Sequence, residues 1–188
     1  MTVQRVFRYL QRIMTAAEVY ESVTNGGASD FADVAAILNR NGPWCLIGGL
    51  AVNCYVEPVY IIDVDLVVDA SWTETSGFDA ENIALAASLI WQRAQTACST
   101  SMLQINFIRD PRYQNFSSRA QLRAVLGQDV PVASLEDVLQ GKIWAWSDRE
   151  RRLSKRKKDE LDLIRIGEAY PKLHELLPKE IAGQLKKG

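Results

Sequence analysis

Hydrophobic and polar positions alternate along some stretches of this chain and recur at helical spacing along others, which predicts an α/β fold. Strand-like runs rich in β-branched and aromatic residues occur at residues 43–47, 61–68 and 102–108. We therefore expect a small mixed sheet flanked by helices, with a helical segment at the C-terminal end. The stretches expected to be helical are residues 1–24, 31–40, 79–96, 117–126, 134–146 and from about 158 to 170.

The chain is long enough for one good hydrophobic core, since it has 188 residues and 47% of them are hydrophobic. We expect residues 1–132 to form the α/β core with its N-terminal helices. Residues 133–188 are expected to form a helical segment that packs on this core within one compact unit. The helix at residues 31–40 is expected to be capped by Ser29 and Asp30, and the helix at 134–146 by a capping box of Ser134 with Asp137.

Charge and composition narrow the class of protein. A net charge of −1 argues against a generic nucleic-acid binder with a uniformly basic surface. No apolar run approaches the length of a transmembrane helix, so no membrane partner is expected. The three cysteines Cys45, Cys54 and Cys98 lie in apolar surroundings and are expected to be reduced. These features together predict a cytoplasmic protein.

Two aspartates, Asp63 and Asp65, interrupt the apolar run at residues 61–68. Because side chains alternate along a strand, both carboxylates are expected on one face, with Val64 and Leu66 on the other. Neighbouring carboxylates among hydrophobic residues are costly to bury unless a cation or another partner compensates them. The pair therefore indicates a hard cation such as Mg²⁺, which takes oxygen ligands and often shares them with substrate phosphates.

A glycine pair, Gly48 and Gly49, separates the expected strand at residues 43–47 from a short helical stretch at 50–55. Glycine lets the backbone approach a ligand closely, and N–H groups at a helix start face an anion. Such a dipeptide is more often a simple tight turn. Thirteen residues separate the glycine pair from Asp63, and this combination strengthens the other interpretation, a phosphate cradle beside a carboxylate pair.

The order Ile47-Gly48-Gly49, a spacer and Asp63-Val64-Asp65 resembles the signature of the nucleotidyltransferase superfamily with the polymerase β-like fold. The C-terminal third resembles the bacterial AbiEii-type nucleotidyltransferase-like proteins. The whole resemblance covers roughly residues 40–170. The second part of it is carried by residues 130–139 and by Lys142, Asp148, Arg149, Lys158, Asp159, Asp162 and Leu163.

This resemblance implies a Mg²⁺- or Mn²⁺-dependent enzyme that moves a nucleotide from a nucleoside triphosphate (NTP) to a hydroxyl of RNA, protein or a small molecule. Asp63 and Asp65 would be the metal ligands, and with Asn106 they form the expected catalytic set. Gly48 and Gly49 would hold the β and γ phosphates. AbiEii-type relatives act as toxins of toxin–antitoxin pairs and some target tRNA, so an RNA or protein acceptor and an antitoxin are the partners implied.

Asn106 is a departure from the superfamily pattern, because it stands where a third carboxylate is usual. An amide can ligate a cation through its oxygen, but it is uncharged and cannot act as a base. Asp110 could substitute if the strand continued that far, which Pro111 disfavours. Three possibilities stay open: an enzyme with another base or none, a protein that binds nucleotide without turnover, and a degenerate relative with vestigial acids.

Basic residues gather in the C-terminal third. In the family pattern, the lysine that corresponds to Lys142 lies near the nucleotide. Lys158, Asp159 and Asp162 match the family's Lys-Asp…Asp motif, which implies a direct role at the nucleotide site. The alternative is a structural ion-pair network that ties the last helix to the core. The remaining cations are expected either on a solvated helix surface or against phosphate or an RNA backbone. They are Arg149, Arg151, Arg152, Lys155, Arg156 and Lys157.

A non-catalytic nucleotide- or protein-binding module on the same fold is therefore the rival to an enzyme. Convergence of Asp63, Asp65 and either Asn106 or Asp110 within metal-ligand reach beside Gly48 would favour the enzyme. A lysine or arginine side chain that occupies the same space would favour the binding module.

Overall fold

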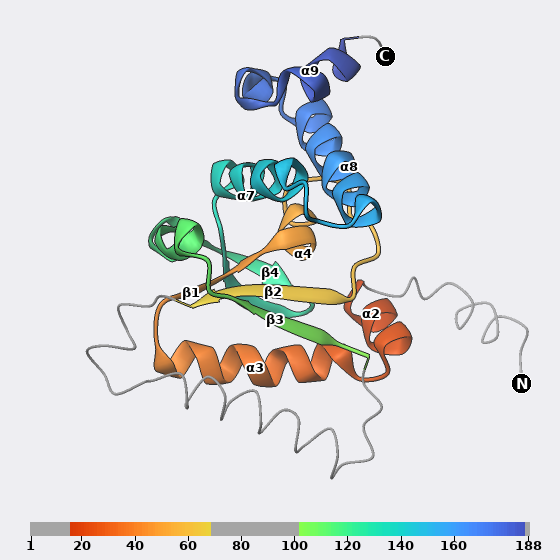
Figure 1. The fold of residues 1–188 in the computed structure, drawn as a ribbon. Helices are drawn as coiled ribbons and strands as arrows, with labels where there is room; N and C mark the ends of the chain where they lie inside the picture. The colour runs from red at the N-terminus through yellow and green to blue at the C-terminus, as the bar shows by residue number, and fades with distance from the viewer. Residues whose placement is uncertain (1–15, 69–101, 187–188) are drawn as a thin grey trace, which may run out of the picture.

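One five-stranded mixed sheet lies between helices, which confirms the predicted α/β class (Figure 1). The computed structural model describes residues 16–68 and 102–186. The helix expected at residues 79–96, most of the one expected at 1–24, and Cys98 lie outside these ranges. No helix within the described ranges is long and apolar enough to cross a membrane.

The strands follow the order β3-β2-β1-β5-β4 across the sheet. Strand β1 pairs antiparallel with β2 and parallel with β5, while β2 pairs parallel with β3, and β4 antiparallel with β5. The register places Asp65 opposite Ile47 on one side and opposite Asn106 on the other. The strands are β1 (Trp44–Ile47), β2 (Asp63–Val68), β3 (Gln104–Ile108), β4 (Gln121–Val125) and β5 (Gln128–Val132).

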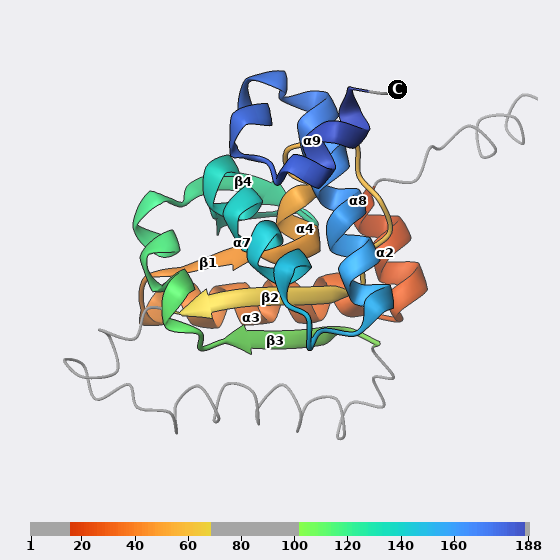
Figure 2. The ribbon, with the colours of Figure 1, turned by 45° about the horizontal axis from the view of Figure 1, so that its top comes forward.

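Helix α3 covers one face of the sheet, and α4, α7 and α8 gather on the other (Figures 1 and 2). The sequence predicted α7 closely, including the Ser134 cap, whose Oγ accepts the N–H of Asp137 at 3.2 Å. It predicted the end of α8, but this helix begins about five residues earlier than expected, at Leu153, within the charged stretch. The helical elements are α2 (Ala16–Thr24), α3 (Gly27–Asn41), α4 (Gly48–Val52), η1 (Pro111–Arg119), α7 (Leu135–Ser147), α8 (Leu153–Ala169), η2 (Pro171–Leu176) and α9 (Lys179–Leu185).

One hydrophobic core joins both predicted segments. Phe31 of α3, Leu66 of β2, Leu139 of α7 and Ile166 of α8 are all inaccessible or nearly so and belong to the same buried cluster. Fully burying each such side chain contributes about 1.5–3 kcal/mol. The C-terminal helices α7 and α8 are thereby held against the sheet. Cys45 and Cys54 form no disulfide with each other, and Cys98 lies outside the described residues.

The prediction of a helix at residues 117–126 was wrong, because this stretch contains the end of η1 and the whole of β4. Strands β4 and β5 form a hairpin whose turn places Leu126 at φ 51° and Gly127 at φ 84°. Two successive positive φ values suit a tight hairpin turn. A leucine rarely adopts this conformation, which hid the turn from the sequence pattern.

The start of α3 also differs from the prediction. The helix begins at Gly27, ahead of the expected cap at Ser29 and Asp30, and its N-cap Gly26 makes no side-chain hydrogen bond. The Glu21 carboxylate of α2 caps it instead, because Oε2 accepts the N–H groups of Ala28 and Ser29 at 2.7 and 3.1 Å. A contact from the preceding helix thus replaces the local cap.

Candidate functional site

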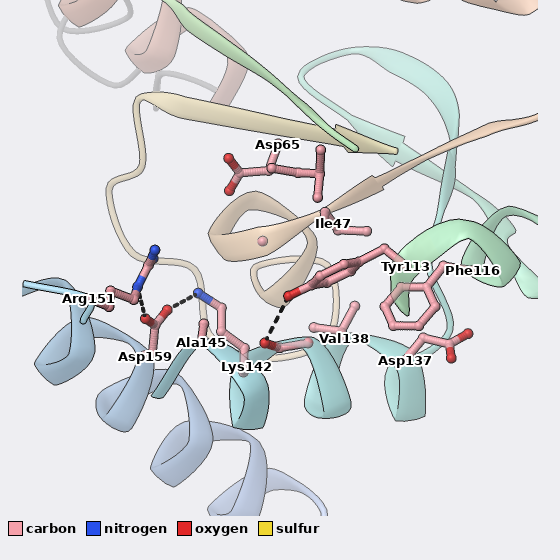
Figure 3. A pocket seen from close by; sticks show the side chains of 13 residues that line it. Ile47, Asp65, Tyr113, Phe116, Asp137, Val138, Lys142, Ala145, Arg151 and Asp159 are labelled. Carbon is pink, nitrogen blue, oxygen red and sulfur yellow. Dashed lines mark hydrogen bonds and ion pairs between the residues drawn. The ribbon is translucent and has the colours of Figure 1, made fainter. Parts of the chain in front are cut away.

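Two adjoining pockets lie between the strands β1 and β2 and the helices α7 and α8. We call the first, of about 130 Å³, the aromatic pocket because Tyr113 and Phe116 form part of its wall (Figure 3). The second, of about 190 Å³, we call the charged pocket because Asp63, Lys155 and Lys158 line it. Both are parts of one groove, since they share four lining residues: Asp65, Lys142, Arg151 and Asp159.

The residues predicted from the sequence come together in this groove. Gly48 lines the aromatic pocket, and Asn106 lines neither pocket but contacts Asp65 directly. The other six line the charged pocket: Gly49, Asp63, Asp65, Lys142, Lys158 and Asp159.

Strand β2 presents the two carboxylates as the alternation predicted. Val64 and Leu66 are fully buried, whereas Asp63 and Asp65 are partly accessible. The Asp65 carboxylate lies against the glycine turn, so that a Cβ atom built on Gly48 would stand 2.1 Å from its Oδ2. Gly48 also has φ +72°, a conformation that L side chains rarely adopt. Both observations require glycine at this position.

Burial raises the pKa of Asp65, because a charged carboxylate loses its hydration there. The Asn106 amide opposes this change by donating a hydrogen bond from Nδ2 to Oδ1 at 2.9 Å. The positive charge of Lys142 acts in the same direction as Asn106, and the negative charge of Asp63 acts against it. In this arrangement Asn106 is a donor that stabilises the Asp65 carboxylate.

Asp63 has a cationic partner. Nζ of Lys155, in the first turn of α8, lies 3.2 Å from its Oδ2. The lysine side chain is 42% exposed and that of Asp63 29%, so this ion pair is partly exposed to solvent. The structure therefore combines the two arrangements that would separate an enzyme from a binding module. Asp65 and Asn106 meet beside Gly48, and a lysine lies on Asp63.

Lys142 is a buried cation held by two carboxylates of α8. Its Nζ lies 3.0 Å from Oδ1 of Asp159 and 2.7 Å from Oδ2 of Asp162. Burial alone would lower the pKa of Lys142, but Asp162 and Asp159 outweigh it and the pKa is raised. Arg151 pairs with Asp159 at 2.8 Å and Arg165 with Asp162 at 2.7 Å. Asp159 thus belongs to a structural ion-pair network between α7 and α8, at the wall of the groove.

The aromatic pocket contains residues that the sequence did not single out. Tyr113 and Phe116 come from η1, just ahead of the stretch at 117–126 that was expected to be helical. The Tyr113 hydroxyl donates a long hydrogen bond of 3.4 Å to the carbonyl of Gly141. Trp144 packs edge-on against Tyr113 with ring centroids 5.1 Å apart. The signal in the sequence that could have pointed to this pocket is the pair of aromatic residues three positions apart that follows Pro111.

Asp110 lines neither pocket. Its side chain caps η1 by accepting the N–H of Arg112 at 3.0 Å and pairs with the Arg112 guanidinium at 2.6 Å. Among the described residues, no three histidine, cysteine or acidic side chains are placed to share a metal ion. Asp63 and Asp65 are therefore the carboxylate donors available on this face of β2.

No family model matches this chain, and no curated protein does. Its function is therefore inferred from the groove itself.

Substituting Gly48→Ala tests the contact with Asp65, and Gly127→Ala is the matched control. Gly127 has φ +84°, but no atom lies within 4 Å of the position that its Cβ would take. Gly127→Ala should therefore lower the free energy of unfolding by only about 1 kcal/mol, the cost of the backbone conformation. Gly48→Ala should cost about 1–3 kcal/mol more, since Asp65 must move. Equal losses in urea unfolding would show that the Asp65 contact is unimportant.

Replacing Lys142 by methionine tests the buried network. We expect Lys142→Met to lower the free energy of unfolding by about 3 kcal/mol, because Asp159 and Asp162 would each lose a partner away from water. Lys158→Met, at an exposed position of the same groove, should change it by less than about 0.5 kcal/mol. A Lys142→Met protein as stable as the wild type in urea unfolding would contradict a stabilising role for this network.

Proposed function

We propose that this chain is a Mg²⁺-dependent nucleotidyltransferase, and that its groove binds the triphosphate of an NTP between β2 and α8. The observation that carries the proposal is the charged pocket, in which two strand carboxylates, the glycine turn and several cations meet. The acceptor would be a hydroxyl of RNA, protein or a small molecule. A role as the toxin of a toxin–antitoxin pair belongs to the same proposal.

The mixture of charges in the charged pocket suits a metal–triphosphate better than either ion alone. Asp63 and Asp65 supply anionic oxygens at the floor of the pocket, on β2. Lys155 and Lys158 supply ammonium groups at its α8 wall. A triphosphate with a bound divalent cation presents the complementary charges to both groups at once. Arg151, whose side chain stays partly exposed in its pairing with Asp159, adds a guanidinium beside them.

The donor set fits Mg²⁺, which proteins commonly hold through one or two carboxylates while water and substrate phosphates complete the coordination. Asp63 and Asp65 would be its protein ligands. When bound, the cation would neutralise charge on the phosphate that is transferred. Mn²⁺ accepts the same oxygen donors.

Lys155 must leave Asp63 for a cation to bind there. Exposed ion pairs are typically worth no more than about 1 kcal/mol, so this contact is weak enough to be displaced. The freed ammonium group would remain beside the charged pocket and could contact a phosphate. In this proposal, Lys155 supplies positive charge to Asp63 without the metal and to a phosphate with it.

A second candidate function is a nucleotide-binding module without turnover. Two observations favour it: Lys155 already neutralises Asp63, and Asn106 offers Asp65 a donor in place of a third carboxylate. Nucleotidyl transfer by this chain would then have to proceed without a base at residue 106.

Calorimetric titration of MgATP, MgGTP, MgCTP and MgUTP tests the proposal. We expect at least one of them to bind the wild type, and binding to be lost without the metal and in Asp63→Ala/Asp65→Ala. The control is Asp129→Ala/Glu180→Ala, which removes the same charge at exposed positions and should bind normally. Absence of NTP binding to the wild type would overturn both candidate functions.

A turnover assay with the NTP that binds then separates the two candidates. The protein is incubated with this NTP, labelled in the α phosphate, and with extracts that supply acceptors. A transferase should release pyrophosphate and transfer the label to a macromolecule or small molecule. Metal-dependent binding with no pyrophosphate release would favour the binding module.

A further inference from the structure

The aromatic pocket continues the groove away from the charged pocket. Asp65, Lys142 and Arg151 line both pockets, so a ligand that extends past Asp65 passes from one to the other. In Figure 3, Lys142, Asp159 and Arg151 lie at one side of the pocket, and Tyr113 and Phe116 at the other. The two ends of the groove thus differ in chemistry, one cationic and one aromatic.

We propose that the aromatic pocket binds the nucleobase of the NTP and selects a pyrimidine. This inference rests on the proposed function, because it requires the triphosphate to lie in the charged pocket. It adds the class of nucleotide, which the sequence motifs do not specify.

The walls of the aromatic pocket suit a flat, uncharged ring. The side chains of Tyr113 and Phe116 share the lining with Val138 and Ala145 of α7, and Ile108 of β3 adds a further apolar surface. Nucleic-acid bases pack on such surfaces through their π faces. Lys155 and Lys158 line only the charged pocket, and the two cations that line both pockets, Lys142 and Arg151, already pair with Asp159.

Polar groups at the edge of the pocket can contact a base. The Tyr113 hydroxyl is held by a long hydrogen bond to Gly141, so it can turn to a ligand. The Asp137 carboxylate, by contrast, is occupied by Arg119 at 2.6 Å and by the hydroxyl of Ser134 at 2.7 Å. Tyr113 is therefore the group through which we expect the ring to be recognised.

The volume of the pocket favours one ring over two. It measures about 130 Å³, slightly less than the roughly 150 Å³ of an engineered apolar cavity in another protein that binds one benzene molecule. A pyrimidine has one six-membered ring, whereas a purine has a second ring fused to it. The enclosed part of the pocket therefore matches a single six-membered ring, and the second ring of a purine would extend beyond it.

Calorimetry with five ligands in Mg²⁺ buffer tests the inference: CTP, UTP, ATP, GTP and inorganic tripolyphosphate. Wild-type protein should bind CTP or UTP at least about tenfold more tightly than ATP, GTP and tripolyphosphate. Ala145→Leu, which fills the aromatic pocket, should remove this advantage and leave tripolyphosphate affinity unchanged. The matched control is Ala36→Leu, the same change at an exposed position of α3, and it should behave as the wild type.

A second variant, Tyr113→Leu, removes the ring and hydroxyl without filling the pocket, so the test does not depend on Ala145→Leu folding. It should weaken pyrimidine nucleotide binding by about tenfold and spare tripolyphosphate. Tripolyphosphate binding with equal or better purine binding would overturn the pyrimidine pocket and leave the proposed function standing. Failure of all five ligands to bind the wild type would overturn both.

Discussion

The partly buried carboxylate of Asp65 is the constraint on which the groove depends. It lies on an inner strand of the sheet, where loss of hydration raises its pKa. Its neighbours reflect that cost: Gly48 has no side chain to collide with it, Asn106 donates a hydrogen bond to it, and Lys142 supplies positive charge.

The cation that faces Asp65 also connects the C-terminal helices to the rest of the fold. Lys142 of α7 binds Asp159 and Asp162 of α8, and Arg165 continues from Asp162 to Asn53 and to the carbonyl of Glu57. Stability and charge at the groove therefore depend on the same side chains. Removing one member would alter the position of α8 as well as the field at Asp65, which links the proposed function to the integrity of the helical segment.

The sequence predicted those parts of the fold and site that follow from local periodicity. The alternation in residues 61–68 placed Asp63 and Asp65 on one face of β2, and the Ser134 cap and the helices α7 and α8 followed from helical spacing. It could not predict that Glu21 caps α3 or that Lys155 meets Asp63, because these contacts join different elements and carry no local pattern. The β4–β5 hairpin was missed because Leu126 adopts a conformation unusual for leucine.

The most direct test of the proposed site is a crystal structure with Mg²⁺ and a non-hydrolysable NTP. It should show the cation within about 2.0–2.1 Å of oxygens of Asp63 and Asp65, the triphosphate in the charged pocket, and Lys155 released from Asp63. An intact Lys155–Asp63 ion pair with the nucleotide bound outside the groove would contradict it.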